Sequence, residues 1–246
     1  MKSFIKITGI IIISILSLFC SSCRMKSNPV RVLLITGGHD FDEKPFYTLM
    51  KSLQDITVSE VKHPEALSMF RPENRKLYDV VLLYDMPERI SEQEKKDFAE
   101  CLMKEGKGLV VLHHAYCSYQ SWPEYKAIVG GRYYQRSWTD DKGVKHPAST
   151  YKHDVDFSVK VADKKHPITK GIDDFRIIDE TYGNGSVNQG VHVLLNTDEK
   201  TSTPSLAWTN RYGKSKVATI LLGHDNNAWT NPSFVKLLTQ AIKWVK

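Results

Sequence analysis

Three apolar runs of this chain end in histidine: Val32-Leu-Leu-Ile-Thr-Gly-Gly-His39, Val110-Val-Leu-His113-His114 and Thr219-Ile-Leu-Leu-Gly-His224. Short runs of branched apolar residues are typical of strands that are buried on both faces of a parallel sheet. In open α/β sheets the ligand binds beyond the carboxyl ends of the strands. We therefore expect the three strands to deliver their histidines to one edge of a sheet and to form a site there.

Strands and helices alternate along the first half of the chain. Strands are predicted at 30–36, 56–61, 78–84 and 108–113, and helices at 45–53 and 91–104. Ser91, with Glu94 three residues later, has the pattern of a capping box, and Gly106 is expected to end that helix. The alternation predicts an α/β fold with a doubly wound, mostly parallel sheet.

The second half is less regular. The predicted elements are a short helix at 122–129, a surface loop at 133–150, strands at 155–161, 175–178 and 191–196, a hairpin over 205–222 and a final helix at 233–245. Because no linker divides this body, we expect a single domain over 30–246.

The N-terminus resembles a bacterial lipoprotein signal. Two lysines precede an apolar run that is short for a membrane span, and the run ends in Cys20-Ser-Ser-Cys23. We expect residues 1–22 to be a signal peptide that is removed, Cys23 to carry the lipid, and 23–29 to form a tether. The protein would then be exported and held at a bacterial membrane (periplasm or cell surface) by its lipid anchor alone. The alternative is an uncleaved N-terminal anchor.

The composition argues against two classes of protein. The chain is 41% hydrophobic and has a net charge of +6, but its basic residues are interspersed with acids. That distribution is typical of a solvated surface and argues against a nucleic-acid partner. Beyond the N-terminal segment the cysteines are Cys101 and Cys117, too few for a disulfide scaffold.

Six short motifs follow one another from about residue 30 to the C-terminus. They are Thr36-Gly-Gly-His-Asp-Phe41, Tyr84-Asp-Met-Pro87, Gly106-Lys-Gly-Leu-Val-Val-Leu-His-His-Ala115, Ser118-Tyr-Gln-Ser-Trp-Pro-Glu-Tyr125, Asp179-Glu-Thr-Tyr182 and Leu222-Gly-His224. In this order and spacing they resemble the ThuA-like family, which is named for trehalose utilisation. The resemblance implies a flavodoxin-like, class I glutamine-amidotransferase-like fold. It also implies a role with disaccharides or glycosides, in some members through 3-keto-sugars. Asp225 departs from the pattern, because family members often have glycine there.

The likeness to amidotransferases concerns the fold alone. Those enzymes carry a nucleophilic cysteine on a tight elbow after a central strand, whereas this stretch reads His113-His114-Ala115. Cys117 lies just beyond it, without the elbow or the base that would activate a thiolate. Glutamine hydrolysis is therefore not expected.

The strand-end histidines are the first catalytic candidates. His39 follows two glycines that permit a tight turn or the close approach of a ligand, although it could simply cap the sheet. Asp42 is close by and is assigned to substrate binding. His113 and His114 are adjacent, and neighbours in a strand point to opposite faces. We therefore expect His114 in the site and His113 packed behind it, so that the two could not chelate one metal.

Two further candidates complete the catalytic set. Glu180 follows the predicted strand at 175–178 and could act as a general base or bind sugar hydroxyls, or it could be an ordinary surface acid. His224 ends the last predicted strand, and His153 is a reserve candidate. Aromatic side chains near the strand ends could stack on a sugar or could only pack in the core; they are Tyr119, Trp122, Tyr182 and Trp229.

His39, His114, Glu180 and His224 are also ligand types that zinc and other divalent ions accept. Their spacing is long-range, so sequence alone cannot show that they converge. Histidine is equally suited to general acid–base catalysis near neutral pH. We therefore assign no cofactor and no metal ligands from the sequence, and leave a divalent metal such as zinc as an alternative.

The leading hypothesis is an enzyme that moves a proton next to the carbonyl of a keto-sugar glycoside, as in isomerisation or elimination. Glu180 or His114 would act as the base, and His39 and His224 would polarise or protonate oxygens. Two alternatives remain, a non-catalytic sugar-binding lipoprotein and a metal-dependent hydrolase. The partner is a small sugar or glycoside. The family resemblance implies a second partner, an oxidoreductase that would supply the keto-sugar. The sequence is also compatible with an oligomer.

Overall fold

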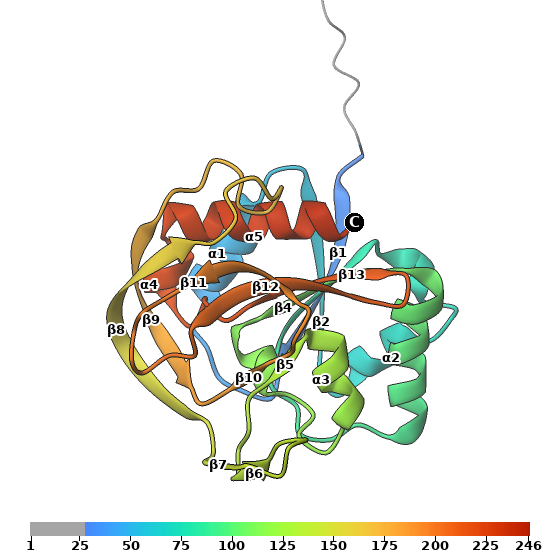
Figure 1. Ribbon diagram of the computed structural model, residues 1–246. Coiled ribbons are helices and arrows are strands. Elements are labelled where there is room, and N and C mark those ends of the chain that lie inside the picture. The colour runs from blue at the N-terminus through green and yellow to red at the C-terminus, as the bar shows by residue number, and fades with distance from the viewer. Residues whose placement is uncertain (1–27) are drawn as a thin grey trace, which may run out of the picture.

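A nine-stranded mixed sheet runs through the computed structural model, which describes residues 28–246 (Figure 1). Its order is β2-β1-β3-β4-β13-β12-β11-β8-β9. The bounds are β1 (Val30–Gly37), β2 (Ile56–Lys62), β3 (Val80–Asp85), β4 (Gly108–Leu112), β8 (Thr150–Val161), β9 (Phe175–Gly183), β11 (His192–Asn196), β12 (Ser205–Tyr212) and β13 (Ser215–Ile220). The expectations for the signal segment and for Cys23 fall outside the described residues.

Helices and short strands complete the fold. The helices are α1 (Glu43–Ser52), α2 (Glu92–Glu105), α3 (Pro123–Val129), α4 (Asn226–Trp229) and α5 (Pro232–Val245), with 3₁₀ turns η1 (Glu65–Phe70), η2 (Arg75–Leu77) and η3 (His113–Cys117). Two small ribbons pair β5 (Gly131–Arg132) with β10 (Ser186–Val187), and β6 (Trp138–Thr139) with β7 (Lys145–His146). Across 28–246, none of the helices has the length and apolar character needed to span a membrane.

The sheet has two halves that differ in strand direction. In the parallel half, β2, β1, β3, β4 and β13 all run the same way. In the antiparallel half, β12, β11, β8 and β9 alternate in direction. The antiparallel half curls over, so that β8 and β9 form the left edge of the molecule in Figure 1.

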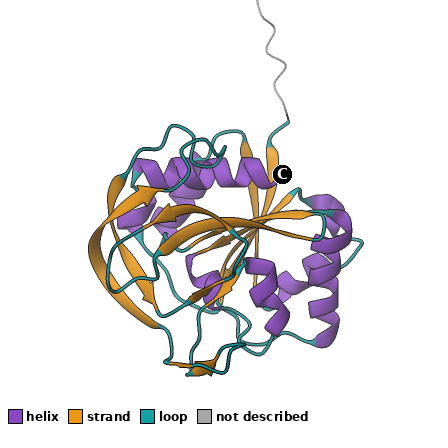
Figure 2. Cartoon of the chain, in the orientation of Figure 1, coloured by secondary structure: helices purple, strands orange, loops and turns teal. Residues whose placement is uncertain are grey.

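Helices cover both faces of the parallel half (Figure 2). Side chains such as Leu34 and Val110 point to one face and pack against α1, α4 and α5. The alternate side chains, such as Leu33 and Val111, point to the other face and pack against η1, α2 and α3. This burial on both faces explains why the strands of the parallel half are continuous apolar runs.

The α/β fold class is confirmed, and most predicted elements are present. The Ser91–Glu94 capping box begins α2, and Gly106 ends it in a left-handed conformation. The sheet is mixed with a parallel core, so antiparallel pairing has a larger share than expected. Several strand ends differ from the prediction, and four of the differences bear on the site: β4 stops at Leu112, β13 stops at Ile220, β8 begins at Thr150, and β9 continues through Gly183.

Candidate active site

His113 lies directly after β4 and leaves the strand direction. Its φ of 49° is in the left-handed region, which non-glycine residues adopt rarely and often at functional sites. The side chain is fully buried, and its Nδ1 donates a hydrogen bond of 2.6 Å to the carbonyl of Leu221. His113 is thus packed in the interior as expected, but the expectation that it points away from the partner of His114 is wrong, because both side chains approach Glu180 Oε2. The alternation on which it rested ends with the strand at Leu112.

Glu180 enters the site from within β9. Lys152 of β8 pairs with Thr181, and the next pair joins Val155 to Asp179, so His153 and Asp154 lie together opposite Glu180. This is a β-bulge, a feature that often re-aims a side chain beside an active site. Asp154 has a φ of 53°. Glu180 therefore belongs to a paired strand and does not follow one as the sequence predicted.

The turn that carries His224 is held from three sides. The carboxylate of Asp179 accepts hydrogen bonds from the main-chain N–H groups of Gly223 (2.7 Å) and His224 (2.9 Å). The hydroxyl of Tyr84 donates to the carbonyl of His224, and the indole of Trp229 donates to that of Gly223. Gly223 has a φ of 116°, and a Cβ there would lie 2.9 Å from the ring of Phe234. The turn therefore requires glycine at this position.

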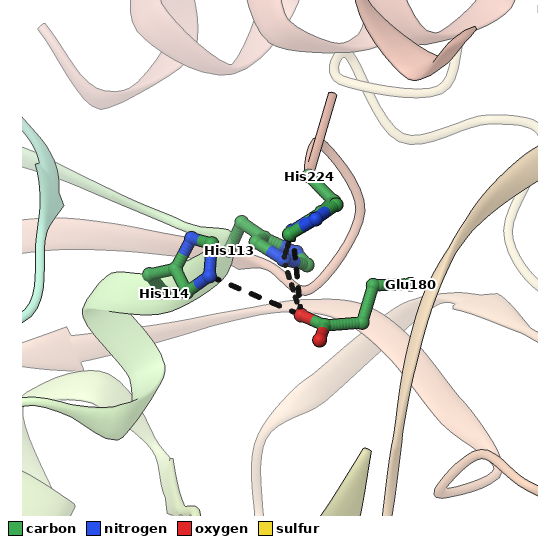
Figure 3. Close-up of side chains that lie close together, drawn as sticks. All are labelled: His113, His114, Glu180 and His224. Carbon is green, nitrogen blue, oxygen red and sulfur yellow. Dashed lines mark hydrogen bonds and ion pairs between the residues drawn. The ribbon is translucent and has the colours of Figure 1, made fainter. Parts of the chain in front are cut away.

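These elements bring four ligand-type side chains together (Figure 3). One ligand atom from each of His113, His114, Glu180 and His224 lies within 4.8 Å of all the others. Glu180 Oε2 is 2.9 Å from His113 Nε2, 3.5 Å from His224 Nδ1 and 3.9 Å from His114 Nε2. We call these residues the His₃Glu group. Three imidazoles and a carboxylate are a donor set that suits zinc and several other divalent ions, so the group could hold a metal.

The hydrogen bond of His113 fixes one feature of the group. A carbonyl oxygen only accepts, so the Nδ1 that faces Leu221 carries a proton. In neutral imidazole the Nε2 atom is then an acceptor, and it faces the acceptor Oε2 of Glu180 at 2.9 Å. Two acceptors at this distance need a proton or a cation between them, and a bound metal ion is one way to supply it.

The protonation states of the other members favour cation binding. Burial lowers the pKa of His114 well below its usual value, and the neighbouring histidines lower it further. Burial and His113 also lower the pKa of His224. Burial raises the pKa of Glu180, but the hydrogen bond and charge of His113 outweigh this and hold that pKa below its usual value. Neutral imidazoles and an ionised carboxylate are the forms that bind metal ions.

A pocket of about 360 Å³ opens beside the His₃Glu group, within the size range of small-molecule sites. His114 and Glu180 lie on its wall, and the side chains that complete it are largely aromatic. The lining residues are Met86, His114, Cys117, Tyr133, Gln135, Tyr151, His153, Glu180 and Tyr182. Substrate in this pocket would therefore contact the group directly.

His39 and His153 lie on opposite sides of the group. The ring of His39 stacks on that of His114 with centroids 4.2 Å apart, and its two nitrogens lie 3.2 Å from the carbonyls of Asp40 and Tyr84. His153 is half exposed in the pocket wall, and its Nδ1 is 3.4 Å from Glu180 Oε1, the oxygen that faces away from the group. His39 therefore supports His114, whereas His153 can reach substrate.

The structure brings together some of the predicted site residues and not others. His114, Glu180 and His224 converge, and Tyr182 lines the pocket and lies 2.9 Å from His113 Nε2 through its hydroxyl. The other four residues assigned to substrate binding lie outside the pocket lining. Asp42 is exposed at the start of α1, Tyr119 and Trp122 are packed in the core near α2 and α3, and Trp229 packs under the His224 turn.

Sequence reasoning missed several pocket residues. Tyr133 and Gln135 fall in the stretch predicted as a surface loop, and Tyr151 lies in the part of β8 that was not predicted as strand. The pattern of apolar and polar residues around these three positions does not mark them as pocket residues. For His113 the sequence did contain a signal, the adjacent pair His113-His114. It would have placed both side chains near the site if the strand had been predicted to end at Leu112.

Comparison with protein families identifies the relationship. Residues 31–245 match the model of the ThuA family, which is described as trehalose utilisation. The chain belongs to the ThuA family. Membership implies a role in the utilisation of trehalose or related sugars. A search of curated proteins finds no match.

Solved structures support the fold. A ThuA-like protein from Parabacteroides merdae has a TM-score of 0.72 and 22% identity over 88% of this chain and 90% of its own. For a ThuA-like protein from Bacteroides uniformis the values are 0.64 and 20%, over 89% and 92%. PurLQS from Thermotoga maritima has a TM-score of 0.53 and 13% identity over 89% and 100%. At these identities the likeness shows the fold alone, which is that of class I glutamine amidotransferases.

Proposed function

We propose that this protein is an enzyme that moves protons beside the carbonyl of a keto-sugar glycoside, at a site organised by a divalent metal ion such as zinc. The observation that carries the proposal is the convergence of His113, His114, Glu180 and His224 beside a pocket of about 360 Å³, with His114 and Glu180 on its wall. Family membership supports the substrate class, because the family model concerns sugar utilisation.

The residues of the His₃Glu group fit a metal on two grounds. Their donor atoms suit zinc, and the close approach of His113 Nε2 to Glu180 Oε2 calls for a proton or a cation between them, a place that a metal ion can take. When bound, such an ion would supply a Lewis acid that polarises a carbonyl or hydroxyl oxygen of the substrate. The chain would hold the ion through His113, His114, Glu180 and His224.

Within this proposal the proton is moved by His153. Its Nδ1 can donate to Glu180 Oε1, which would fix the tautomer and leave Nε2 as the basic nitrogen. A carboxylate that orients an imidazole in this way is a frequent arrangement for a general base. This assignment moves the role of base from Glu180 or His114, where the sequence placed it, to a neighbour of Glu180.

The protonation state of Cys117, a potential nucleophile, supports proton transfer over covalent catalysis. Cys117 lines the pocket, but burial raises the pKa of its thiol far above the usual value. A neutral thiol is a poor nucleophile. Tyr133 and Tyr151 add aromatic surface on which the apolar face of a sugar ring could stack.

The test is NMR of the zinc-loaded protein with trehalose and simple glucosides and, separately, with their 3-keto derivatives in D₂O. We expect new product resonances, or exchange of the hydrogen beside the carbonyl, from the keto-sugars alone. Both should be about 100-fold slower in His153→Gln. Saturable binding without turnover would favour a sugar-binding protein. Release of free sugar from unoxidised glycosides would favour a metal-dependent hydrolase.

Export and partners are further parts of this proposal and rest on the sequence. Cys20-Ser-Ser-Cys23 at the end of the apolar run supports anchoring through a lipid on Cys23. Mass spectrometry of the membrane fraction should find a lipid-modified N-terminal peptide that begins at Cys23, and the lipid should be lost in Cys23→Ala. An oxidoreductase that makes 3-keto-glycosides is the partner that the chemistry requires upstream.

A further inference from the structure

A second cavity adjoins the active-site pocket. It measures about 430 Å³ and shares Gln135 with that pocket. Two arginines, Arg132 and Arg136, lie in its wall together with the indole of Trp138. The two cavities are therefore neighbours, with the exposed side chain of Gln135 at their boundary.

Arg132 is positioned by main-chain contacts. Its guanidinium donates to the carbonyls of Tyr119 (3.0 Å) and Gln120. Within residues 28–246 no carboxylate lies at ion-pair distance from Arg132 or Arg136, so neither charge is neutralised by a partner of the kind that Arg31 has in Asp79. A half-buried arginine that is fixed by carbonyl oxygens and faces a cavity has charge available for a ligand.

The acids nearby do not neutralise the cavity, and the aromatic wall is rigid. Asp140 is already bound to His146 at 2.9 Å and accepts two main-chain hydrogen bonds. Trp138 is stacked between Tyr134 and His146, with centroids 4.1 Å and 4.4 Å away. Lys126 adds a third cation, with its Nζ 5.7 Å from the centre of the Trp138 ring. The cavity is thus positively charged and preformed.

We propose that this cavity is a subsite for an anionic sugar unit, one that carries a carboxylate or a sulfate ester, next to the sugar that is transformed. The guanidinium of Arg132 brings its positive charge to the cavity wall, together with the N–H groups that the carbonyls of Tyr119, Gln120 and Trp122 leave free to pair with such an anion. Arg136 and Lys126 add attraction at longer range, and Gln135 lies where the two sugar units meet. The inference rests on the proposed function only for the position of the neighbouring sugar.

The test compares the binding of three ligands by calorimetry: trehalose, trehalose with one 6-hydroxymethyl group oxidised to a carboxylate, and trehalose 6-sulfate. We expect the anionic forms to bind about tenfold or more tightly than trehalose, the value of one charge-assisted hydrogen bond. The preference should shrink as salt is raised. The carboxylate and sulfate arms show which anion fits better.

Two variants localise the effect, and one controls for charge. Arg136→Gln, at an exposed side chain, should lower the preference without changing stability. Arg132→Lys should keep the charge but weaken the preference, because lysine cannot make the several carbonyl contacts that hold the guanidinium in the cavity wall. Arg211→Gln, on an exposed part of β12, should leave it intact. Equal binding of all three sugars, a preference that survives in both cavity variants, or no binding of the anionic sugars at millimolar concentration would overturn the subsite.

The calorimetric binding of anionic sugars can succeed or fail independently of the proposed keto-sugar chemistry. Binding is measured without turnover and without added metal. Inactivity toward keto-sugars together with preferential binding of anionic sugars would overturn the proposed function and leave the subsite standing. Turnover of keto-sugars without any preference for anionic sugars would support the proposed function and overturn the subsite.

Discussion

The parallel and antiparallel halves of the sheet build the site in different ways. The parallel half contributes histidines from loops just beyond its strand ends: His39 after β1, His113 and His114 after β4, and His224 after β13. The antiparallel half contributes Glu180 and His153 from inside paired strands, at a bulge. One half thus supplies neutral ligand atoms and the other supplies the negative charge.

This difference shows that neither half can form the site alone. The parallel half without Glu180 would hold three imidazoles and no carboxylate. The antiparallel half reaches the group because Asp179, next to Glu180, binds the main chain of the His224 turn at 2.7 Å and 2.9 Å. Burial raises the pKa of Asp179 to about 6, and its main-chain hydrogen bonds counteract this rise. The two halves are therefore joined at the point where the group forms.

The largest expected effect comes from removing the contribution of the antiparallel half. Glu180→Gln keeps the shape but removes the only carboxylate of the His₃Glu group. It should lower zinc affinity more than about 100-fold, since even groups that only orient ligands contribute 10–100-fold. It should also abolish turnover. Zinc affinity is measured by competition with a chromophoric chelator. Asp156→Asn, at an exposed acid of β8, is the matched control, and equal losses in both variants would contradict the assignment.

The next effect distinguishes two ligands of the parallel half. In chelator, His113→Ala should reduce the free energy of unfolding by about 3 kcal/mol, because it removes the closest partner of the buried carboxylate of Glu180 and leaves a cavity in place of a fully buried ring. The side chain of His224 is 24% exposed, and His224→Ala should cost only about 1 kcal/mol or less. Urea unfolding measures both. Similar losses in stability would show that His113 is not the buried centre of the group.

A smaller effect separates proton transfer from metal binding. His153→Gln should lower turnover of a keto-sugar about 100-fold, the lower range for loss of a general base. Zinc affinity should stay unchanged, because His153 faces Glu180 Oε1 and not the group. The mutation is assayed by NMR and by chelator competition on the same preparation. A parallel loss of zinc would make His153 a ligand.

The smallest expected effect concerns the two buried cysteines. Burial raises the pKa of both Cys101 and Cys117, so neither should react with iodoacetamide at pH 8 in the folded protein. Both should react after denaturation, which provides the control. Alkylation is read by peptide mass spectrometry. Rapid modification of Cys117 with loss of turnover would return it to the list of candidate nucleophiles.

The parallel half could be predicted from the sequence, and the antiparallel half only in part. Apolar runs with histidine ends are local signals, and they located His39, His114 and His224 correctly at one edge. Glu180 was singled out as a carboxylate that follows a predicted strand, but its place inside β9 and the bulge at His153 depend on pairing with β8. Such pairing is a long-range property that periodicity does not encode. His113 was misplaced because one residue decides whether strand alternation still applies.

The central claim is that the two halves meet in one metal site, and anomalous diffraction at the zinc edge from crystals grown with zinc tests it most directly. We predict one strong peak bounded by His113 Nε2, His224 Nδ1, Glu180 Oε2 and the ring of His114. The peak should be absent from crystals of Glu180→Gln. Zinc bound only elsewhere, or no peak in the wild-type protein at stoichiometric zinc, would contradict the claim.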